Sequence, residues 1–370
     1  MKVWKKKRIW LLLLFPLSVL FLELAKRSTW FAEEVFAKRI YKVHSITVSA
    51  VTGIVPFSIA EWIVILCPFL FLGLLIRFIV HIIKKKKERF SRCILALINV
   101  ACVAAVVFFV YVIGCGVNYH RLSIVDYREI TVRDSGKEEL FALCTELAGR
   151  ASALREELVS YEDEEGVFRL PMSNRELGRL AKEGYEALSA ELPVLKGLYP
   201  APKGICFSKV YSAMELTGVF TCWTMEANVN IDIPDYSRGA TMTHELGHLH
   251  GFMKEEEANF LAYLACMASD SPVLQYSGTM LALVYSGNAL ASQDAELYGQ
   301  LWAGYHEGMV RDLRANSAYW DQYKDTVISK AADKVNDTYL KVNKQEDGVK
   351  SYGRVVDLLL AEYRKEHNLK

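Results

Sequence analysis

The stretch His244-Glu245-Leu246-Gly247-His248 has the spacing of a metal-binding helix. Residues four apart on a helix project from one face, so the two imidazoles can bind a single metal ion. Glu245 lies about 100° around the helix from His244, where its carboxylate can hold a water molecule and take its proton. The pattern therefore predicts a helix that carries a hydrolytic zinc site.

The residues after this helix must supply a further ligand, because a catalytic zinc ion usually takes three protein ligands. His250 follows His248 by two residues, about 200° around the helix, so we expect a surface or packing histidine that points away from the metal. Gly251 can end the helix in the left-handed conformation. The chain would then turn through 252–254 and begin a second helix at Glu255.

That second helix starts with three consecutive glutamates, Glu255 to Glu257, followed by Ala258 and Asn259. Glu255 and Asn259 are four apart and share a face, so one can bind zinc while the other hydrogen-bonds a ligand. Alternatively, the glutamates only stabilise a helix N-terminus, where the helix dipole favours negative charge.

HELGH followed by an E-x-x-A-N helix resembles the gluzincin metalloproteases, in which a glutamate on the next helix completes the zinc site. It is also similar to the E-x-x-A-D element of membrane proteases of the CAAX prenyl protease and heat-shock type. The resemblance implies that His244, His248 and Glu255 are zinc ligands, that Glu245 is the general base, and that Asn259 is a hydrogen-bond partner of a ligand.

One feature departs from the gluzincin pattern. The seven-residue step from His248 to Glu255 is shorter than most gluzincins use and is closer to the metzincin spacing HExxHxxGxxH. Lys254 occupies the third-ligand position of the metzincins, and a protonated amine cannot bind a metal. Glu255 is therefore the natural substitute, and Glu257 is the fallback ligand.

Longer segments resemble one bacterial membrane family, the domain-of-unknown-function 3810 group. The shared segments are TGIVPFS (52–58), EANVNIDIPD (226–235), the HELGH–EEEAN block and GVKSYGRVVDLLLAEY (348–363). This resemblance spans nearly the whole chain, but it implies no substrate. Tyr352 and Arg354, in the last segment, are candidates for stabilising an oxyanion, with packing and capping as the alternative roles.

The composition indicates a membrane protein with a sizeable soluble part, since 52% of the 370 residues are hydrophobic. A net charge of +1 and the absence of a basic stripe interleaved with aromatics argue against a nucleic-acid partner. Three apolar segments, about 9–25, 62–83 and 93–117, are predicted to span the membrane. The first could be a signal-peptide core, but no small-x-small cleavage site follows it, so we expect an uncleaved anchor.

The basic residues predict the orientation of these spans. Five Lys or Arg lie in the first eight residues and six in the loop 84–92, so both stretches should be cytoplasmic. The chain would then divide into a three-helix membrane region, 1–117, and an extracytoplasmic zincin-like domain, 118–370, at a bacterial inner membrane. The apolar stretch 273–291 is interrupted by polar residues, so we expect a buried helix there.

The outer domain is predicted to be α+β. Helical periodicity covers 135–160 and 173–192, with Ser173 and Glu176 in capping-box spacing. Strands are expected at 205–213, 217–224 and 227–233, before the metal helix. Almost everything after residue 258 is predicted to be helical, which gives a C-terminal helical lobe.

The strand 227–233 alternates apolar and polar residues, which is typical of a half-buried strand. Its polar face carries Asn228, Asn230 and Asp232, and by resemblance to zincins this strand could pair with an extended substrate. An ordinary sheet strand with a solvated face is the equal alternative. Cys206 and Cys222 fall in adjacent predicted strands and could form a disulfide outside the cytoplasm.

These features predict a membrane-anchored Zn²⁺ metalloprotease that acts on a peptide or protein substrate outside the cytoplasm, with the lipid bilayer as its other partner. Two alternatives remain open. The outer domain could be a zinc-stabilised binding or sensor module without activity, although only short cytoplasmic loops would receive its signal. It could also be an amidase that acts on cell-wall material.

Overall fold

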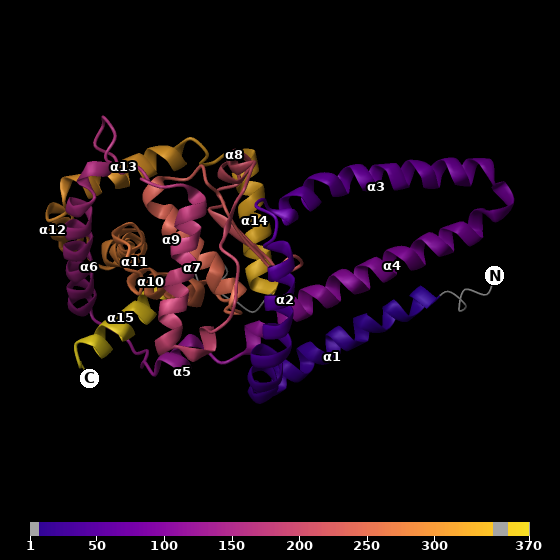
Figure 1. Ribbon diagram of the computed structural model, residues 1–370, viewed down its shortest axis with the longest axis horizontal. Coiled ribbons are helices and arrows are strands. Elements are labelled where there is room, and N and C mark those ends of the chain that lie inside the picture. Colours follow the sequence, from indigo (N-terminus) through magenta and orange to yellow (C-terminus); the bar gives the residue numbers. More distant parts are fainter. Residues whose placement is uncertain (1–6, 343–353, 370) are drawn as a thin grey trace.

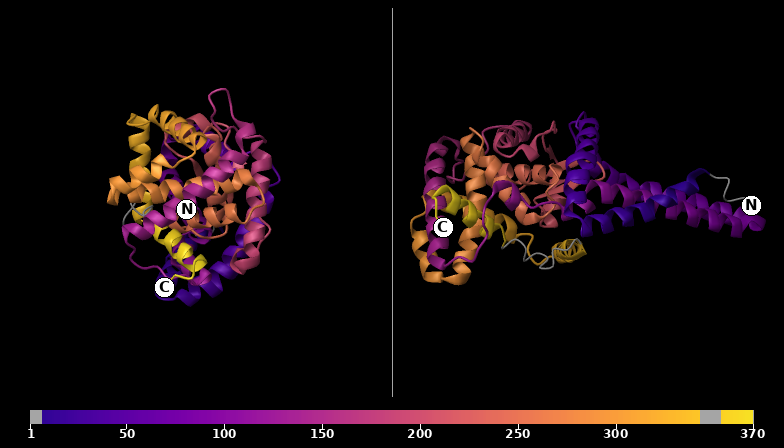
Figure 2. Two further views of the ribbon diagram at one scale, coloured as in Figure 1. Left: turned by 90° about the vertical axis from the view of Figure 1, so that its left-hand side faces the viewer. Right: turned by 90° about the horizontal axis from the view of Figure 1, so that it is seen from below.

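The computed structural model describes residues 7–342 and 354–369. The fold is mostly helical, with one small three-stranded sheet. A helical body holds the sheet, and three apolar helices project from one side of it (Figures 1 and 2). The α+β expectation is correct in its elements, but the strands are a minor part.

Three helices are long and apolar enough to cross a membrane, as the sequence predicted. The first is the 3-10 turn η2 (Lys7–Leu13) continued by α1 (Leu14–Arg27), and the others are α3 (Ile59–Lys84) and α4 (Arg89–Gly114), joined by η4 (Lys86–Glu88). Side chains along α3 are exposed, for example Phe69 at 71% and Phe71 at 66%. Such exposure of large apolar groups is what contact with lipid requires.

The connection between the first two spans is helical and belongs to the body. It forms the π-helix η3 (Phe31–Tyr41) and α2 (Lys42–Thr52). In Figure 1, α2 stands beside the place where the three spans meet the body. Phe36 and Tyr41 are fully buried in the same hydrophobic cluster as Leu246 of the metal helix. The proposed division at residue 117 stays a prediction, but this core draws residues from both sides of it.

Several helical elements lead from the third span to the sheet. They are η5 (Gly116–His120), α5 (Ile124–Arg128), α6 (Lys137–Glu157), η6 (Val159–Tyr161), α7 (Asn174–Glu191) and η7 (Pro193–Leu195). The helices α6 and α7 confirm the predictions for 135–160 and 173–192. The Ser173 hydroxyl accepts the backbone N–H of Glu176 at 3.2 Å, so the predicted N-cap forms.

The sheet has the order β1-β3-β2. The strand β1 (Lys203–Gly204) is parallel to β3 (Glu226–Val229), and β2 (Gly218–Thr221) is antiparallel to it. The prediction of a strand over 205–213 is wrong, because α8 (Ser208–Ala213) lies there. The Glu61 carboxylate accepts the N–H groups of Cys206 and Phe207 at 2.9 and 2.7 Å and so stabilises the start of α8.

The prediction of a half-buried strand over 227–233 is also wrong. The strand β3 is central and buried along its whole length, and the chain leaves the sheet at Asn230. Both edges of β3 are already paired, so no substrate can add to it. The alternation of apolar and polar residues over 227–233 therefore covers both the end of β3 and the turn that follows it.

The three polar residues proposed to face a substrate bind the protein instead. Asn228 donates to the carbonyl of Glu226 at 3.2 Å, and Asn230 donates to the carbonyl of Leu216 at 2.9 Å. Asp232 accepts the Tyr319 hydroxyl at 2.8 Å. They are structural residues, and their assignment as substrate-strand candidates is wrong.

The segments 52–58 and 226–235, both quoted above for the family resemblance, meet at the start of the second span. The Glu226 carboxylate accepts the N–H groups of Ile59 and Ala60 at 3.0 and 2.8 Å, which satisfies the first turn of α3. Lys203 donates to Glu226 at 2.6 Å and to the carbonyl of Thr52 at 2.7 Å. The sheet is thus fastened directly to a spanning helix.

The helix that carries His244 and His248, and then the C-terminal helical lobe, follow the sheet. Their helices are α9 (Asp235–Leu249), α10 (Glu255–Met267), α11 (Pro272–Gln293), α12 (Ala295–Ala303), α13 (Glu307–Asp321), α14 (Val327–Val342) and α15 (Arg354–Glu366). The expected buried helix over 273–291 is α11, and the apolar run 358–360 is buried in α15. The predicted helical lobe is confirmed.

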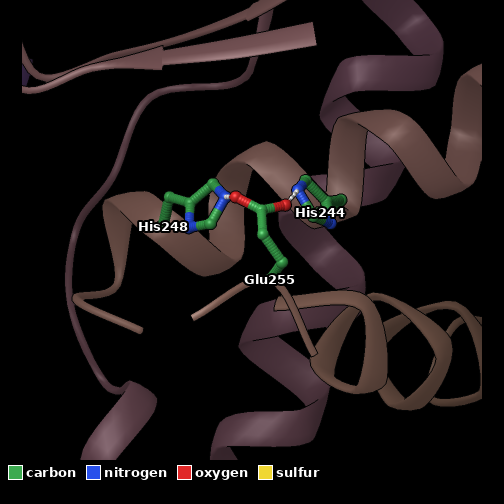
Figure 3. Close-up of side chains that lie close together, drawn as sticks. All are labelled: His244, His248 and Glu255. Atoms are coloured by element: carbon green, nitrogen blue, oxygen red, sulfur yellow. Dashed lines mark ion pairs between the residues drawn. The ribbon is translucent and has the colours of Figure 1, made fainter. Parts of the chain in front are cut away.

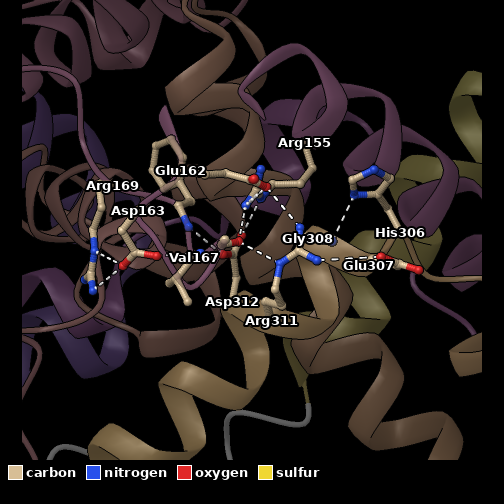
Figure 4. A network of polar contacts seen from close by, with 12 residues as sticks. Arg155, Glu162, Asp163, Val167, Arg169, His306, Glu307, Gly308, Arg311 and Asp312 are labelled. Carbon is tan, nitrogen blue, oxygen red and sulfur yellow. Dashed lines mark hydrogen bonds and ion pairs between the residues drawn. The ribbon is translucent and has the colours of Figure 1, made fainter. Parts of the chain in front are cut away.

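A buried polar network holds the lobe to α6 (Figure 4). Asp312 of α13 accepts the Arg155 guanidinium at 2.8 Å, the Tyr276 hydroxyl at 2.6 Å and the N–H of Phe168 at 2.8 Å. Arg155 also pairs with Glu162 at 2.9 Å. Because every partner of Asp312 comes from a different segment, this carboxylate fixes α6, α11 and α13 together.

The eight cysteines are free. Cys206 is exposed and lies at the start of α8, whereas Cys222 is buried and its thiol interacts with that of Cys115 at the end of the third span. The disulfide that Cys206 and Cys222 could have formed is therefore not made, and the strand assigned to Cys206 is not formed either.

Candidate metal centre

A tight turn after α9 brings the second helix back against the first. Gly251 has a φ of +96°, the left-handed conformation that the sequence predicted for this position. A Cβ there would lie 2.9 Å from Arg121 and from Tyr41, so glycine also allows a close approach. The helix α10 then begins at Glu255, as expected, and its first residue faces α9.

The turn brings His244, His248 and Glu255 together (Figure 3). One potential ligand atom from each lies within 4.8 Å of the others. The Nε2 atom of His244 is 3.3 Å from one Glu255 oxygen, and Nε2 of His248 is 3.5 Å from the other. Two imidazoles and one carboxylate on neighbouring helices are a donor set that could hold a metal ion.

Hydrogen bonds orient both imidazoles. Nδ1 of His244 lies 2.9 Å from the side-chain oxygen of Asn259, and Nδ1 of His248 lies 2.8 Å from the carbonyl of Phe252. Both partners can only accept, so each Nδ1 carries the proton. The Nε2 lone pairs are then left for a metal, and Asn259 has the role that the resemblance implied.

His248 and Glu255 stabilise each other's charged forms. Burial works to lower the pKa of His248, but the Glu255 carboxylate outweighs it and raises this pKa to about 9. Burial opposes ionisation of Glu255, yet the two histidines hold its pKa well below the usual range. The carboxylate is therefore ionised, and a divalent cation would compete with the histidine proton for the same position.

Glu245 lies under the edge strand β2. Its side chain is only 3% exposed, it accepts a backbone hydrogen bond from Phe220, and its Oε2 atom has no partner within the described residues. A Cβ at Gly218 would lie 2.9 Å from the Glu245 carboxyl carbon, so the strand passes close by. Burial raises the pKa of Glu245 to about 7, which suits a group that accepts and returns a proton near neutral pH.

A cavity of about 240 Å³ opens beside the cluster. His244, Glu255 and Asn259 form part of its wall, and the rest is mainly apolar or aromatic: Tyr236, Met280, Leu281, Val284, Tyr285 and Trp320. Tyr285 of α11 thus shares the cavity with two potential ligands. The sequence analysis did not identify Tyr285, because it predicted only a buried helix over 273–291 and assigned no site residue to it.

A family model described as "Protein of unknown function (DUF3810)" matches residues 36–360. The chain belongs to the DUF3810 family. No curated protein and no solved structure matches it. The matched range includes the membrane-proximal helices, the metal cluster and most of α15.

Two further residues of the DUF3810 chain that the sequence analysis proposed for the site, Glu257 and Arg354, lie outside the His244–His248–Glu255 cluster. Glu257 accepts the Ser123 hydroxyl at 2.6 Å and the N–H of Ile124 at 3.2 Å, so it caps α5 and is not available as the fallback ligand. Arg354 lies 3.7 Å from Glu256 and is not in the cavity wall. Tyr352 lies outside the described residues.

His250 is a packing residue. It is 8% exposed, its ring stacks on that of Tyr185 with centroids 4.4 Å apart, and its Nδ1 bonds the carbonyl of Leu246 at 2.8 Å. Its ring is engaged on the side of α9 that faces α7, which agrees with the expected angle around the helix.

Proposed function

We propose that this DUF3810 protein is a membrane-anchored zinc metallopeptidase. The observation that carries the proposal is the convergence of His244, His248 and Glu255, with both histidine Nδ1 atoms bonded to acceptors. A zinc ion held by these ligands would acidify a water molecule and polarise a substrate carbonyl. The buried Oε2 of the adjacent Glu245, which has no hydrogen-bond partner in the described part of the chain, supports a hydrolytic role over a purely structural metal site.

Three residues around the cluster would have separate roles in hydrolysis. Glu245 accepts a proton from the attacking water and passes it to the leaving amine. Asn259 keeps the His244 ring in place. Tyr285, in the cavity wall beside Glu255, takes the place of Tyr352 and Arg354 as the candidate donor to the developing oxyanion.

The shape of the site favours an extended peptide. The strand β2 is an edge strand, and Thr217, just before it, lines the cavity with His244. A peptide that adds to the edge of β2 opposite β3 would gain main-chain hydrogen bonds, and one of its side chains could enter the cavity. The apolar wall around Met280 and Trp320 indicates a large apolar side chain next to the bond that is cleaved.

The proposal places this chemistry outside the cytoplasm of a bacterial cell. Clustered Lys and Arg in the first eight residues and in 84–92 support a cytoplasmic location of both stretches. The body follows the third span and would then lie on the opposite side of the inner membrane.

The test is turnover of a peptide library by the full-length protein in detergent, with and without zinc, beside the Glu245→Gln variant. Loss of one general base should lower turnover by about 10²- to 10⁴-fold, while zinc content is unchanged. Glu183→Gln, which changes an exposed glutamate on α7, is the matched control. Full activity of Glu245→Gln would refute the mechanism.

The same assay separates the alternatives. A wild-type protein that binds zinc but cleaves neither peptides nor wall fragments would support a binding or sensor module. Cleavage of purified wall fragments without any peptide turnover would support an amidase instead.

A further inference from the structure

A second cavity, of about 430 Å³, is lined in part by η3 and α2, the helices that follow the first span. Its wall contains three cationic side chains, Lys38, Lys42 and Arg121, and the aromatic rings of Tyr41, Tyr127 and Tyr199. None of its lining residues is a carboxylate. The site proposed for peptide hydrolysis shares no residue with it.

The positive charge of this cavity is only partly neutralised. Arg121 pairs with the buried Glu33 at 3.1 Å, and Lys38 pairs with Glu34 at 2.5 Å. Within the described part of the chain, Lys42 and the nearby Lys196 form no ion pair. Three cations line the cavity and two of them have a carboxylate partner, so Lys42 is left uncompensated, and Lys196, outside the cavity wall, adds a second positive charge nearby.

The charged form of Lys42 is destabilised by its surroundings. Burial lowers its pKa, and the charges of Arg121 and Lys196 lower it further. The side chain is half-buried, so water offsets the repulsion only in part. A bound anion would relieve this repulsion, which is the usual reason for keeping unpaired cations together.

The position of the cavity indicates where such an anion could come from. Lys38 and Lys42 belong to η3 and α2, which follow the outer end of the first span, and α2 stands where the spans leave the body (Figure 1). This is the level at which phospholipid headgroups meet a membrane protein. Lys and Arg side chains gathered in one pocket can bind a phosphate group through charge-assisted hydrogen bonds.

We propose that the cavity lined by Lys38, Lys42 and Arg121 binds a phosphate group, either of an anionic phospholipid headgroup or as the free ion. Lys42 and Lys196 supply the uncompensated charge, and Tyr199, Val194 and Pro193 form the less polar side. The same cavity touches the C-terminus of the metal helix. The Tyr41 hydroxyl donates to the carbonyls of His248 and Leu249 at 3.1 and 3.0 Å.

The experiment has two arms on full-length protein in detergent. In the first, native mass spectrometry compares retention of phosphatidylglycerol and phosphatidylcholine added in equal amounts. In the second, calorimetry measures binding of inorganic phosphate. Both use the wild type, Lys42→Glu and Lys196→Glu, with Lys324→Glu on the exposed turn after α13 as a control of equal charge change. Lys196 is exposed, so its variant should fold even if Lys42→Glu does not.

We expect binding in at least one arm that weakens by about tenfold or more in Lys42→Glu and in Lys196→Glu, but not in Lys324→Glu. Preference for phosphatidylglycerol without phosphate binding would identify a headgroup site, and saturable phosphate binding would identify the free ion. Absence of binding in both arms, or equal loss in the control variant, would overturn the proposal.

Discussion

At the scale of single residues, Gly218 determines how closely β2 approaches Glu245. A Cβ added at this glycine would lie 2.9 Å from the Glu245 carboxyl and side-chain methylene carbons, so the carboxylate would have to move. We predict that Gly218→Ala lowers peptide turnover by about 10²-fold, the cost of a misplacement of about 1 Å, with zinc affinity unchanged.

The control for this prediction is Gly149→Ala in α6, where an added Cβ meets no atom within 4 Å. Turnover and zinc content of both variants are measured side by side. Equal activity of Gly218→Ala and the wild type would show that Glu245 is not held in place by the strand.

Asn259 is the residue that fixes the His244 ring. We predict that Asn259→Ala weakens zinc binding by about 10- to 100-fold, because the imidazole loses the acceptor that sets its proton and its orientation. Competition with a chelator of known affinity measures the change. Asn288→Ala, at an exposed position of α11, should leave affinity unaltered, and a similar loss there would count against the orienting role.

Much of the candidate site could be predicted at this scale, since it depends on local spacing. The four-residue step from His244 to His248 and the glycine turn to Glu255 are both visible in the sequence. Tyr285 and Gly218 could not be found, because their place depends on how α11 and β2 pack against α9. No sequence spacing links them to the metal helix.

At the scale of elements, the predicted strands over 205–213 and 227–233 were wrong because tertiary contacts outweigh the local strand propensity there. Val210 and Tyr211 favour a strand, but Glu61 at the start of a spanning helix caps the backbone just before them and α8 forms. The alternating residues after Val229 satisfy hydrogen bonds in a turn. The spans and the long amphipathic helices were predictable because length and periodicity alone specify them.

The C-terminal helix α15 is tied to α6 by one bidentate pair, in which Arg364 donates to Glu139 at 2.6 and 2.8 Å. This hydrogen bonding holds the pKa of Glu139 below its usual value of 4.5. A carboxyl whose pKa is lower in the folded than in the unfolded state stabilises the fold above the unfolded pKa. That stability is lost as the pH falls from about 4.5 through the folded pKa.

We therefore predict that the melting temperature falls more steeply between about pH 5 and pH 3 in the wild type than in Glu139→Gln, which lacks this titration. Unfolding followed by circular dichroism in detergent measures both slopes. Glu183→Gln, which removes an exposed i,i+4 partner, should keep the wild-type slope. Identical slopes for the wild type and Glu139→Gln would contradict the prediction.

At the scale of the whole molecule, the proposed orientation can be tested with single accessible thiols. In a background in which the three exposed cysteines, Cys67, Cys93 and Cys206, are changed to Ser, we predict that Lys324→Cys reacts with a membrane-impermeant maleimide in intact spheroplasts. Lys86→Cys, between the second and third spans, should react only after lysis. The reverse pattern would place the metal cluster in the cytoplasm.

The hydroxyl of Tyr41 has a consequence for the fate of the protein in the cell. It donates to two carbonyls in the last turn of α9, yet it belongs to the chain before the second span. Arg121 donates to the carbonyl of His250 at the same helix end, and it is held there by its ion pair with Glu33, which also precedes the second span. A cut after the third span would therefore remove the hydrogen bonds that hold the end of α9, so we expect the proposed peptidase to work only while it stays in the membrane, on substrates that approach the bilayer.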